Sequence, residues 1–323
     1  MTRKEAFRVL GLVSNATLDD AKKAYRDRVK VMHPDKDPSS GAKLRFILVQ
    51  NAYEVITNQL VKGKPAKEES PRPERDRPSR TRTHQLDRES HAIRYFEHGA
   101  QMYELEQYAD AIAEFDAAIL FNPKFADAYY ACGVAKYAFR QYAASIPDFD
   151  AAIRLSLSHL DDCHYWRGRA KYKLRQYSAS LADFDAAIRH EDNVAAYYYW
   201  RGTAKFKLGQ YAACVHDYDE VIRLERDYVD AYYWRGRAKY EIGHYAASVH
   251  DYTEAIRTTP DYADAYCYRG RAKYELEQYA AAIQDFDEAI RLRPGFKYAR
   301  YGRFRARNEL KNGNASLTEP VEW

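Results

Sequence analysis

After residue 90 the chain repeats itself every 34 residues, apart from one step of 35, and this period constrains the fold more than any other feature. A glycine opens each copy, a tyrosine follows nine residues later, and a small residue stands three positions further on. An aromatic residue and an isoleucine then follow in register. Such a period is typical of solenoids, whose units bury apolar side chains only against their neighbours. The glycines are Gly99, Gly133, Gly168, Gly202, Gly236 and Gly270.

Each copy predicts two helices. The glycine and the small residue mark positions where helices approach closely, and the aromatic residues and the isoleucine fill the space between units. In four copies an aspartate of the second helix precedes an arginine by four residues. We expect each ion pair to lie on an exposed helix face and to stabilise the helix by roughly a few tenths of a kcal/mol. These charges are structural and not catalytic. The pairs are Asp150 with Arg154, Asp185 with Arg189, Asp219 with Arg223, and Asp287 with Arg291.

This pattern resembles the tetratricopeptide repeat over residues 91–295, where spacing and residue type agree in six copies. The resemblance implies a right-handed α-solenoid. Residues 296–313 look like a further first helix, with Phe304 at the position of the glycine, and a polar capping helix is what the end of a solenoid requires. Residues 314–323 are then a tail.

The N-terminal part has its own helical pattern, over residues 5–58. The pattern breaks once, at residues 32–38, where two prolines and three aspartates predict a loop. Thr17 precedes two aspartates, so we expect its hydroxyl to cap the helix that follows. In that helix Lys22, Tyr25 and Arg26 share one stripe, which suits an acidic surface.

Residues 1–60 resemble a J-domain, with three or four helices. The resemblance rests on residues 7–12 (FRVLGL), 20–26 (DAKKAYR) and 51–56 (NAYEVI), and on the HPD string between the last two. It implies that the string and the basic helix face dock on a DnaK-type heat-shock chaperone and stimulate its ATPase. Arg28 departs from the family, which more often has an apolar core residue there. The implied docking residues are His33, Pro34, Asp35, Lys22, Tyr25 and Arg26.

Residues 61–90 carry many prolines and charges and almost no apolar side chains, which predicts a flexible basic linker. Charge also divides the chain. Residues 1–60 carry 11 basic and 7 acidic side chains, the linker 9 and 6, and the remainder 31 and 34. A basic head on a slightly acidic body favours an acidic partner at the N-terminal end and makes nucleic acid an unlikely ligand, although the linker leaves polyanion binding as a third hypothesis.

The resemblance to tetratricopeptide repeats also implies a protein or peptide client in a groove lined by the first helices. These helices predict an aromatic and basic ladder, which suits a partner with acidic and aromatic residues. The alternative interpretation is that the tyrosines pack between repeats. The candidate groove residues are Tyr130, Tyr165, Arg169, Tyr172, Tyr199, Tyr233, Arg237 and Tyr240.

Other site classes find no support in the sequence. The four cysteines are far apart, so we expect reduced packing residues and no metal or cofactor, and no arrangement of side chains indicates an enzyme. No apolar run reaches the roughly 18 residues that cross a bilayer, which makes the cytoplasm the expected location. Besides polyanion binding, two functions remain. One is a co-chaperone that holds a client, and the other is a scaffold subunit that keeps the J-domain only for docking.

Overall fold

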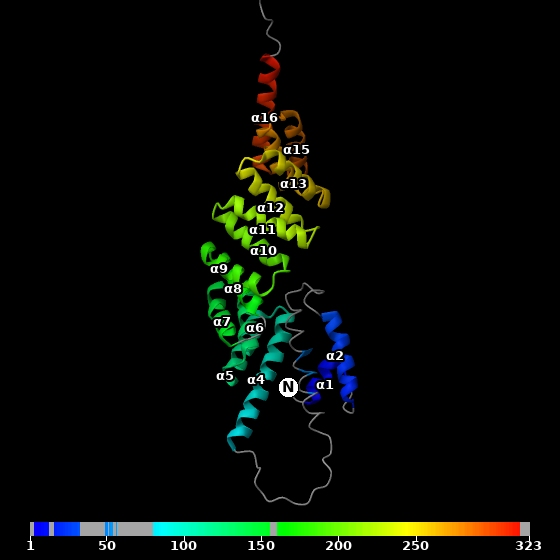
Figure 1. Ribbon diagram of the computed structural model, residues 1–323, viewed down its shortest axis with the longest axis vertical. Coiled ribbons are helices and arrows are strands. Elements are labelled where there is room, and N and C mark those ends of the chain that lie inside the picture. The colour runs from blue at the N-terminus through cyan, green and yellow to red at the C-terminus, as the bar shows by residue number, and fades with distance from the viewer. Residues whose placement is uncertain are drawn as a thin grey trace, which may run out of the picture. The chain divides into compact units, whose positions relative to one another are not determined.

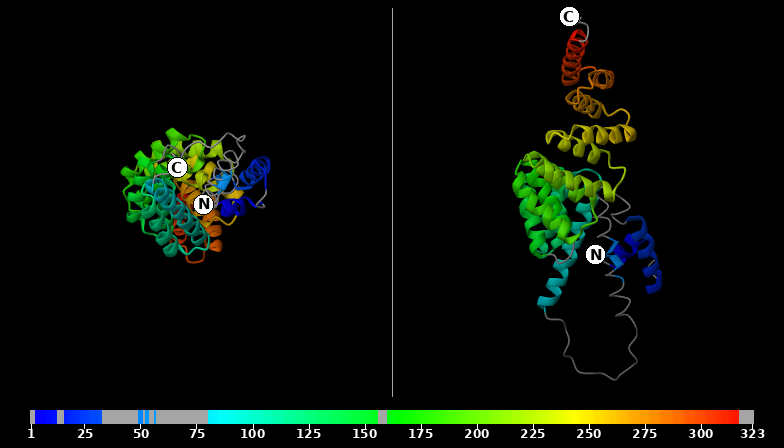
Figure 2. Two further views of the ribbon diagram at one scale, coloured as in Figure 1. Left: turned by 90° about the horizontal axis from the view of Figure 1, so that it is seen from below. Right: turned by 45° about the horizontal axis from the view of Figure 1, so that its top comes forward.

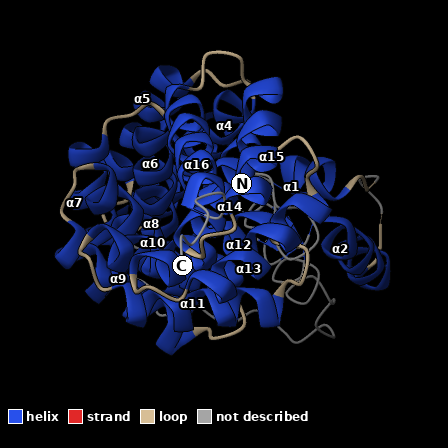
Figure 3. Ribbon diagram, turned by 90° about the horizontal axis from the view of Figure 1, so that it is seen from above, coloured by secondary structure: helices blue, strands red, loops and turns tan. Residues whose placement is uncertain are grey.

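The computed structural model describes most of the solenoid region and parts of the N-terminal region, and every element in this described part is a helix (Figure 3). The expected all-α fold class is confirmed. The chain divides into two compact units, residues 1–170 and 171–323. The described residues are 3–12, 16–32, 49–50, 52–53, 56, 80–155 and 160–316.

The N-terminal module packs two helices, α1 (Arg3–Leu10) and α2 (Leu18–Met32), with the helical residues 49–50, 52–53 and 56 (Figure 1). Its buried core draws on all three segments, through Phe7, Ala21 and Ile56 among others. Half-buried residues of α2, which include Tyr25 and Val29, pack against this core. The helical pattern of the sequence therefore predicts this core correctly.

Arg28 does not disturb the core of the module. A Cβ built on Gly11, whose φ is +68°, would lie 2.8 Å from a terminal nitrogen of the Arg28 guanidinium. The arginine therefore lies against the backbone of the turn after α1, and Val29 supplies the apolar contact that the usual core residue makes.

Thr17 caps α2 as expected. Its hydroxyl accepts a hydrogen bond of 3.2 Å from the backbone N–H of Asp20, and the Asp20 carboxylate accepts bonds from the Thr17 N–H (2.8 Å) and hydroxyl (2.7 Å). These two residues form a reciprocal capping box. The bonds from Thr17 stabilise the charged carboxylate and lower the pKa of Asp20 below its ordinary value.

The expected linker is shorter than residues 61–90. Helix α4 begins at Arg80 and runs to Glu104, so the last eleven residues of that range are helical. No proline or glycine follows Pro78 until Gly99, and Ala92 and Phe96 are fully buried. Once packing has formed a helix, each further residue adds a hydrogen bond at a small cost in free energy. The helix therefore continues through the polar residues before Ala92. Residues 61–79 lie outside the described residues.

Six helix pairs follow one another within the described part of the chain, as the six copies predict (Figure 1). The tyrosine nine residues after each glycine is the first residue of each second helix. After α4 the helices are α5 (Tyr108–Phe121), α6 (Ala126–Ala138), α7 (Tyr142–Leu155), α8 (Leu160–Lys173), α9 (Tyr177–His190), α10 (Ala195–Lys207), α11 (Tyr211–Leu224), α12 (Val229–Glu241), α13 (Tyr245–Thr258), α14 (Ala263–Glu275), α15 (Tyr279–Leu292) and α16 (Lys297–Ser316).

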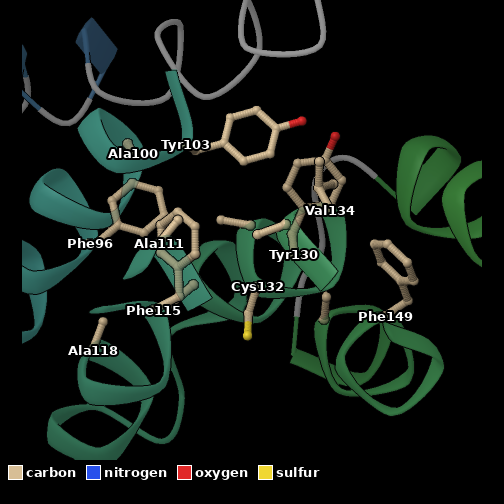
Figure 4. Packing of buried hydrophobic residues seen from close by; sticks show 14 of the residues in the cluster. Phe96, Ala100, Tyr103, Ala111, Phe115, Ala118, Tyr130, Cys132, Val134 and Phe149 are labelled. Carbon is tan, nitrogen blue, oxygen red and sulfur yellow. The ribbon is translucent and has the colours of Figure 1, made fainter. Parts of the chain in front are cut away.

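The glycines make close helix contacts, as their recurrence predicts. A Cβ at Gly133 would lie 2.7 Å from the Phe149 ring, and one at Gly236 would lie 2.8 Å from the Tyr252 ring. Figure 4 shows the buried cluster around this contact in the first unit, where Phe115, Tyr130 and Phe149 come from successive helices. Each ring fills the space that a missing side chain leaves, so the two helices of a pair pack closely through a ring against a glycine.

The second unit continues the same packing (Figure 2). Its last helix, α16, packs on α15, because a Cβ at Gly302 would lie 2.5 Å from the Phe286 ring. The close approach thus falls on Gly302 rather than on Phe304, which is 61% exposed. The capping helix was expected over residues 296–313, and α16 reaches three residues into the expected tail.

Candidate functional site

The basic face of α2 is present in the N-terminal module. Lys22 and Arg26 are exposed, and the Arg26 guanidinium Nε donates a hydrogen bond of 3.2 Å to the Lys22 carbonyl. Tyr25 lies differently, because its ring stacks on Tyr53 at a centroid distance of 4.3 Å and an interplanar angle of 20°. The two cations are therefore available to a partner, whereas the tyrosine mainly holds the module together.

The HPD string is the other part of the expected docking site. His33, Pro34 and Asp35 lie outside the described residues. Helix α2 ends at Met32, the residue directly before them, so the basic face and the string are consecutive along the chain.

Ion pairs cross between helices throughout the solenoid. Asp251 is completely buried, and it accepts bonds from Arg235 at 2.7 Å and from Lys239 at 2.8 Å. Arg235 also reaches Asp219 of the preceding helix pair at 2.6 Å. Arg235 thus bridges two successive second helices, and Arg201 does the same through Asp185 and Asp217. Each of five first-helix arginines pairs with at least one second-helix aspartate, and we call them the clamp arginines: Arg167, Arg201, Arg235, Arg269 and Arg303.

The ion pairs of the clamp arginines differ from the expected aspartate–arginine pairs within the second helices. Asp185 pairs with Arg201 at 2.8 Å, and Asp219 pairs with Arg235, rather than with the arginine four residues later. Arg223 instead donates to Glu220 at 2.8 Å. The reason is geometric, since a half-buried guanidinium approaching from the next first helix reaches the aspartate with less loss of side-chain freedom than an exposed one.

A second arginine follows four of the five clamp arginines by two positions, on a different side of the helix, whereas Thr203 follows Arg201. The Arg169 guanidinium carbon lies 4.6 Å from the centroid of the Trp166 ring and 5.0 Å from that of Tyr137. Arg237 lies 4.1 Å from the Tyr268 centroid. These contacts are cation–π interactions, and we call Arg169, Arg237, Arg271 and Arg305 the aromatic-face arginines.

The expected groove tyrosines are only partly accessible. Tyr130 and Tyr233 are 6% exposed, so they belong to the core, whereas the other four are half-buried. Tyr172 and Tyr240 meet the tyrosine that begins the following helix, edge to face, at 5.1 and 5.3 Å. These contacts close each helix pair, which supports the packing interpretation for part of the ladder.

Burial also changes the acidity of these hydroxyls. It raises the pKa of Tyr172 to about 12, and it raises that of Tyr233 to about 12 although the nearby Arg237 acts in the opposite direction. The tyrosines are therefore neutral hydrogen-bonding groups at physiological pH, and the arginines carry the positive charge of this face.

Sequence reasoning missed two aromatic-face arginines, Arg271 and Arg305, although Tyr240, the ring that Arg271 contacts, was among the expected groove residues. Arg271 lies 4.9 Å from the Tyr240 centroid, and Arg305 lies 4.6 Å from the Tyr274 centroid. The signal was available for Arg271, since the string Arg-Gly-Arg at residues 235–237 recurs at 269–271.

The four cysteines are free and buried, as expected. Burial raises the pKa of both Cys214 and Cys267 to about 12, which keeps these thiols protonated. Among the residues with described positions, no helix is both long and apolar enough to span a bilayer. The same residues contain no group of three or more His, Cys, Asp or Glu side chains that is placed to hold a metal ion.

Family models match both parts of the chain. A DnaJ domain model matches residues 5–62. A tetratricopeptide repeat model matches residues 165–213 and 235–295, and a second repeat model matches residues 99–138 and 202–243. The matches follow the division that the sequence pattern predicts.

Curated relatives match the N-terminal part. The chaperone protein DnaJ of Leifsonia xyli is 48% identical over 52 residues, which is 16% of this chain and 14% of that protein. DnaJ homolog subfamily C member 16 of Mus musculus is 42% identical over 55 residues, covering 17% of this chain and 7% of that protein. The chain thus spans less than a fifth of the length of these relatives.

Solved structures match the solenoid. The C-terminal part of a TPR repeat-containing protein from Cytophaga hutchinsonii superposes with a TM-score of 0.58 and 16% identity, over 69% of this chain and 89% of that one. YrrB, described as a TPR protein with an unusual peptide-binding site, gives a TM-score of 0.53 and 20% identity over 58% of this chain and 96% of its own. At such identities the likeness shows the fold alone. The chain therefore carries a DnaJ domain at its N-terminal end, followed by tetratricopeptide repeats.

Proposed function

We propose that the chain is a non-enzymatic co-chaperone. Its DnaJ domain recruits a DnaK-type heat-shock chaperone and stimulates that partner's ATPase, while the solenoid holds a protein client. The observation that carries the proposal is the DnaJ match over residues 5–62, which contains the HPD string directly after a helix with an exposed basic face. The repeats add the surface for the client.

Each docking residue has a physical role in this proposal. Lys22 and Arg26 attract an acidic surface of the chaperone and raise the rate of encounter. Pro34 restricts the backbone, Asp35 accepts hydrogen bonds from an arginine or a backbone N–H, and His33 adds a directional donor. Because none of these groups takes part in covalent chemistry, the chain acts on the nucleotide cycle only through its partner.

The client side of the proposal rests on the aromatic-face arginines. They are held by rings on the first helices, so a client with acidic and aromatic residues finds charges that are already oriented. Half-buried members of the expected groove supply contact groups in each unit, Tyr165 and Arg169 in the first and Arg237 among others in the second. Tyr130 and Tyr233 support it from within the core.

Single-turnover ATP hydrolysis by a DnaK-type chaperone tests the proposal. The full chain should accelerate hydrolysis, and His33→Gln should abolish that acceleration because the HPD donor is lost. His250→Gln is the matched control, since this histidine of α13 has a 74% exposed side chain. Equal rates with and without the wild-type chain would reject the co-chaperone. If a partner still copurified with the chain, that result would favour the scaffold.

A further inference from the structure

The second unit has a pocket near its C-terminal end, and Tyr240 is the one expected groove residue among its walls. It encloses about 270 Å³ and lies against α12, α14, α15 and α16. This volume is smaller than the roughly 300 to 1,000 Å³ of most small-molecule sites, and it suits a single side chain. Its principal walls are Tyr240, Arg271, Tyr274, Tyr298, Tyr301 and Arg305.

Two guanidinium groups line the pocket in fixed orientations. Arg271 donates to the Tyr240 hydroxyl at 3.4 Å, and its guanidinium carbon lies 5.0 Å from the Tyr268 centroid. Arg305 donates to the Tyr274 hydroxyl at 3.0 Å. Stacking on a ring removes much of the freedom of an arginine side chain, so neither group has to be ordered when an anion arrives.

The two guanidiniums differ from their neighbours in lacking an anion. Arg269 pairs with Asp285 at 2.7 Å and Arg303 pairs with Asp287 at 2.6 Å. Arg271 and Arg305 form no ion pair with any carboxylate of the described residues, although Glu275 also lines the pocket. A carboxylate from outside would therefore complete the local charge balance and accept bonds from both groups.

The rim of the pocket is aromatic and basic. Tyr298 is 77% exposed and Tyr301 is 62% exposed, which is unusual for side chains of this size next to a packed core. Helix α16 itself carries basic residues from Lys297 to Lys311 and a single acidic residue, Glu309, up to that point. Rings with one apolar and one polar end, beside excess positive charge, match an acidic segment with an adjacent apolar residue.

We propose that this pocket binds an acidic side chain of a partner's peptide segment, with a neighbouring apolar residue on the Tyr298 and Tyr301 rings. The inference rests on the proposed function, because it assigns one contact point to the client that the solenoid holds. It commits to glutamate or aspartate as the anchor, since the pocket presents two guanidiniums and accommodates one side chain.

Fluorescence anisotropy with the full chain and two labelled peptides tests this site. One peptide carries Glu-Leu-Glu-Phe between glycine-serine flanks, and its twin carries Gln-Leu-Gln-Phe. The glutamate peptide should bind at least tenfold more tightly than its twin at low salt. The double change Arg271→Met and Arg305→Met should remove this difference, and Tyr298→Ala should weaken binding severalfold without disturbing the fold, because this ring is mostly exposed.

The control is the double change Lys297→Met and Arg300→Met, which also removes two positive charges, from exposed positions of α16. The affinity of this control variant for the glutamate peptide should differ from that of the wild type by less than twofold. Equal binding of the two peptides, or glutamate binding that survives the double change, would overturn the proposal. Because the pocket variants leave residues 1–60 intact, they should still stimulate ATP hydrolysis. The failure of this site is thus distinguishable from the failure of the co-chaperone proposal.

Discussion

The clamp arginines and the aromatic-face arginines stand two residues apart on the same helices, and yet their main partners differ, although Arg237 also lies 4.0 Å from the Glu241 carboxylate. Arg235 holds Asp219 and the buried Asp251 at 2.6 and 2.7 Å, whereas Arg237 lies among the rings of Phe206, Trp234 and Tyr268. One side of each first helix thus meets carboxylates of second helices, and the other meets aromatic rings.

The comparison separates stability from binding. A guanidinium that is paired with a buried carboxylate is fully engaged within the fold and has no bond to offer a ligand. A guanidinium on a ring keeps most of its hydrogen-bond donors, because the cation–π contact uses its face rather than its N–H groups. We therefore expect changes on the clamp side to affect unfolding, and changes on the aromatic side to affect partner affinity.

Removal of a clamp carboxylate is the change with the largest expected effect. Asp251→Ala leaves Arg235 and Lys239 half-buried without their shared anion, and breaking a buried ion pair in this way costs about 4 kcal/mol. Urea denaturation followed by circular dichroism at 222 nm measures the loss. Asp261→Ala, at an exposed position just before α14, is the control and should shift the midpoint little. A small effect of Asp251→Ala would mean that the clamp adds no stability.

Replacement of the two neighbouring arginines by methionine tests the contrast directly. Methionine keeps much of the aliphatic stem, so each variant loses mainly its charge. Arg235→Met should cost about 2 kcal/mol in unfolding free energy, because Asp251 keeps only Lys239. Arg237→Met should cost about 0.5 kcal/mol, which is the scale of one partly exposed cation–π contact. Equal losses would abolish the distinction between the two sides.

A gain of stability is expected where one clamp is incomplete. Thr253 occupies the position of Asp219 in the next helix pair, and Arg269 donates to its hydroxyl at 3.2 Å. Thr253→Asp should add an ion pair and raise the unfolding free energy by about 0.5 kcal/mol, a modest amount because the position is exposed. Thr253→Asn, which is similar in size but uncharged, should not stabilise. The gain should also shrink in 1 M salt, since ions screen exposed pairs.

The repeat period alone predicts the helix pairs and their contacts. The spacing from Gly133 to Tyr142 and Phe149 locates both the turn and the ring that meets the glycine, because these are local distances along two adjoining helices. The capping of α2 by Thr17 is equally local, and the structure confirms it.

The partners in the ion pairs could be identified only from the three-dimensional structure. Asp185 has Arg189 four residues ahead and Arg201 sixteen residues ahead, and only the stacking of successive helices shows that the more distant arginine is the partner. The pocket beside Arg271 and Arg305 could not be predicted from the sequence for the same reason, because the two arginines come from different helices. The start of α4 was misplaced because composition was averaged over residues 61–90, which hid the proline-free stretch after Pro78.

The central claim is that the DnaJ domain acts on a DnaK-type ATPase for a client held by the solenoid. The most direct test is single-turnover ATP hydrolysis by such a chaperone with wild-type chain, with His33→Gln, and with the pocket variant Arg271→Met and Arg305→Met. The account predicts stimulation by the wild type and by the pocket variant, and none by His33→Gln. Stimulation that persists in His33→Gln, or is absent from the wild type, would contradict it.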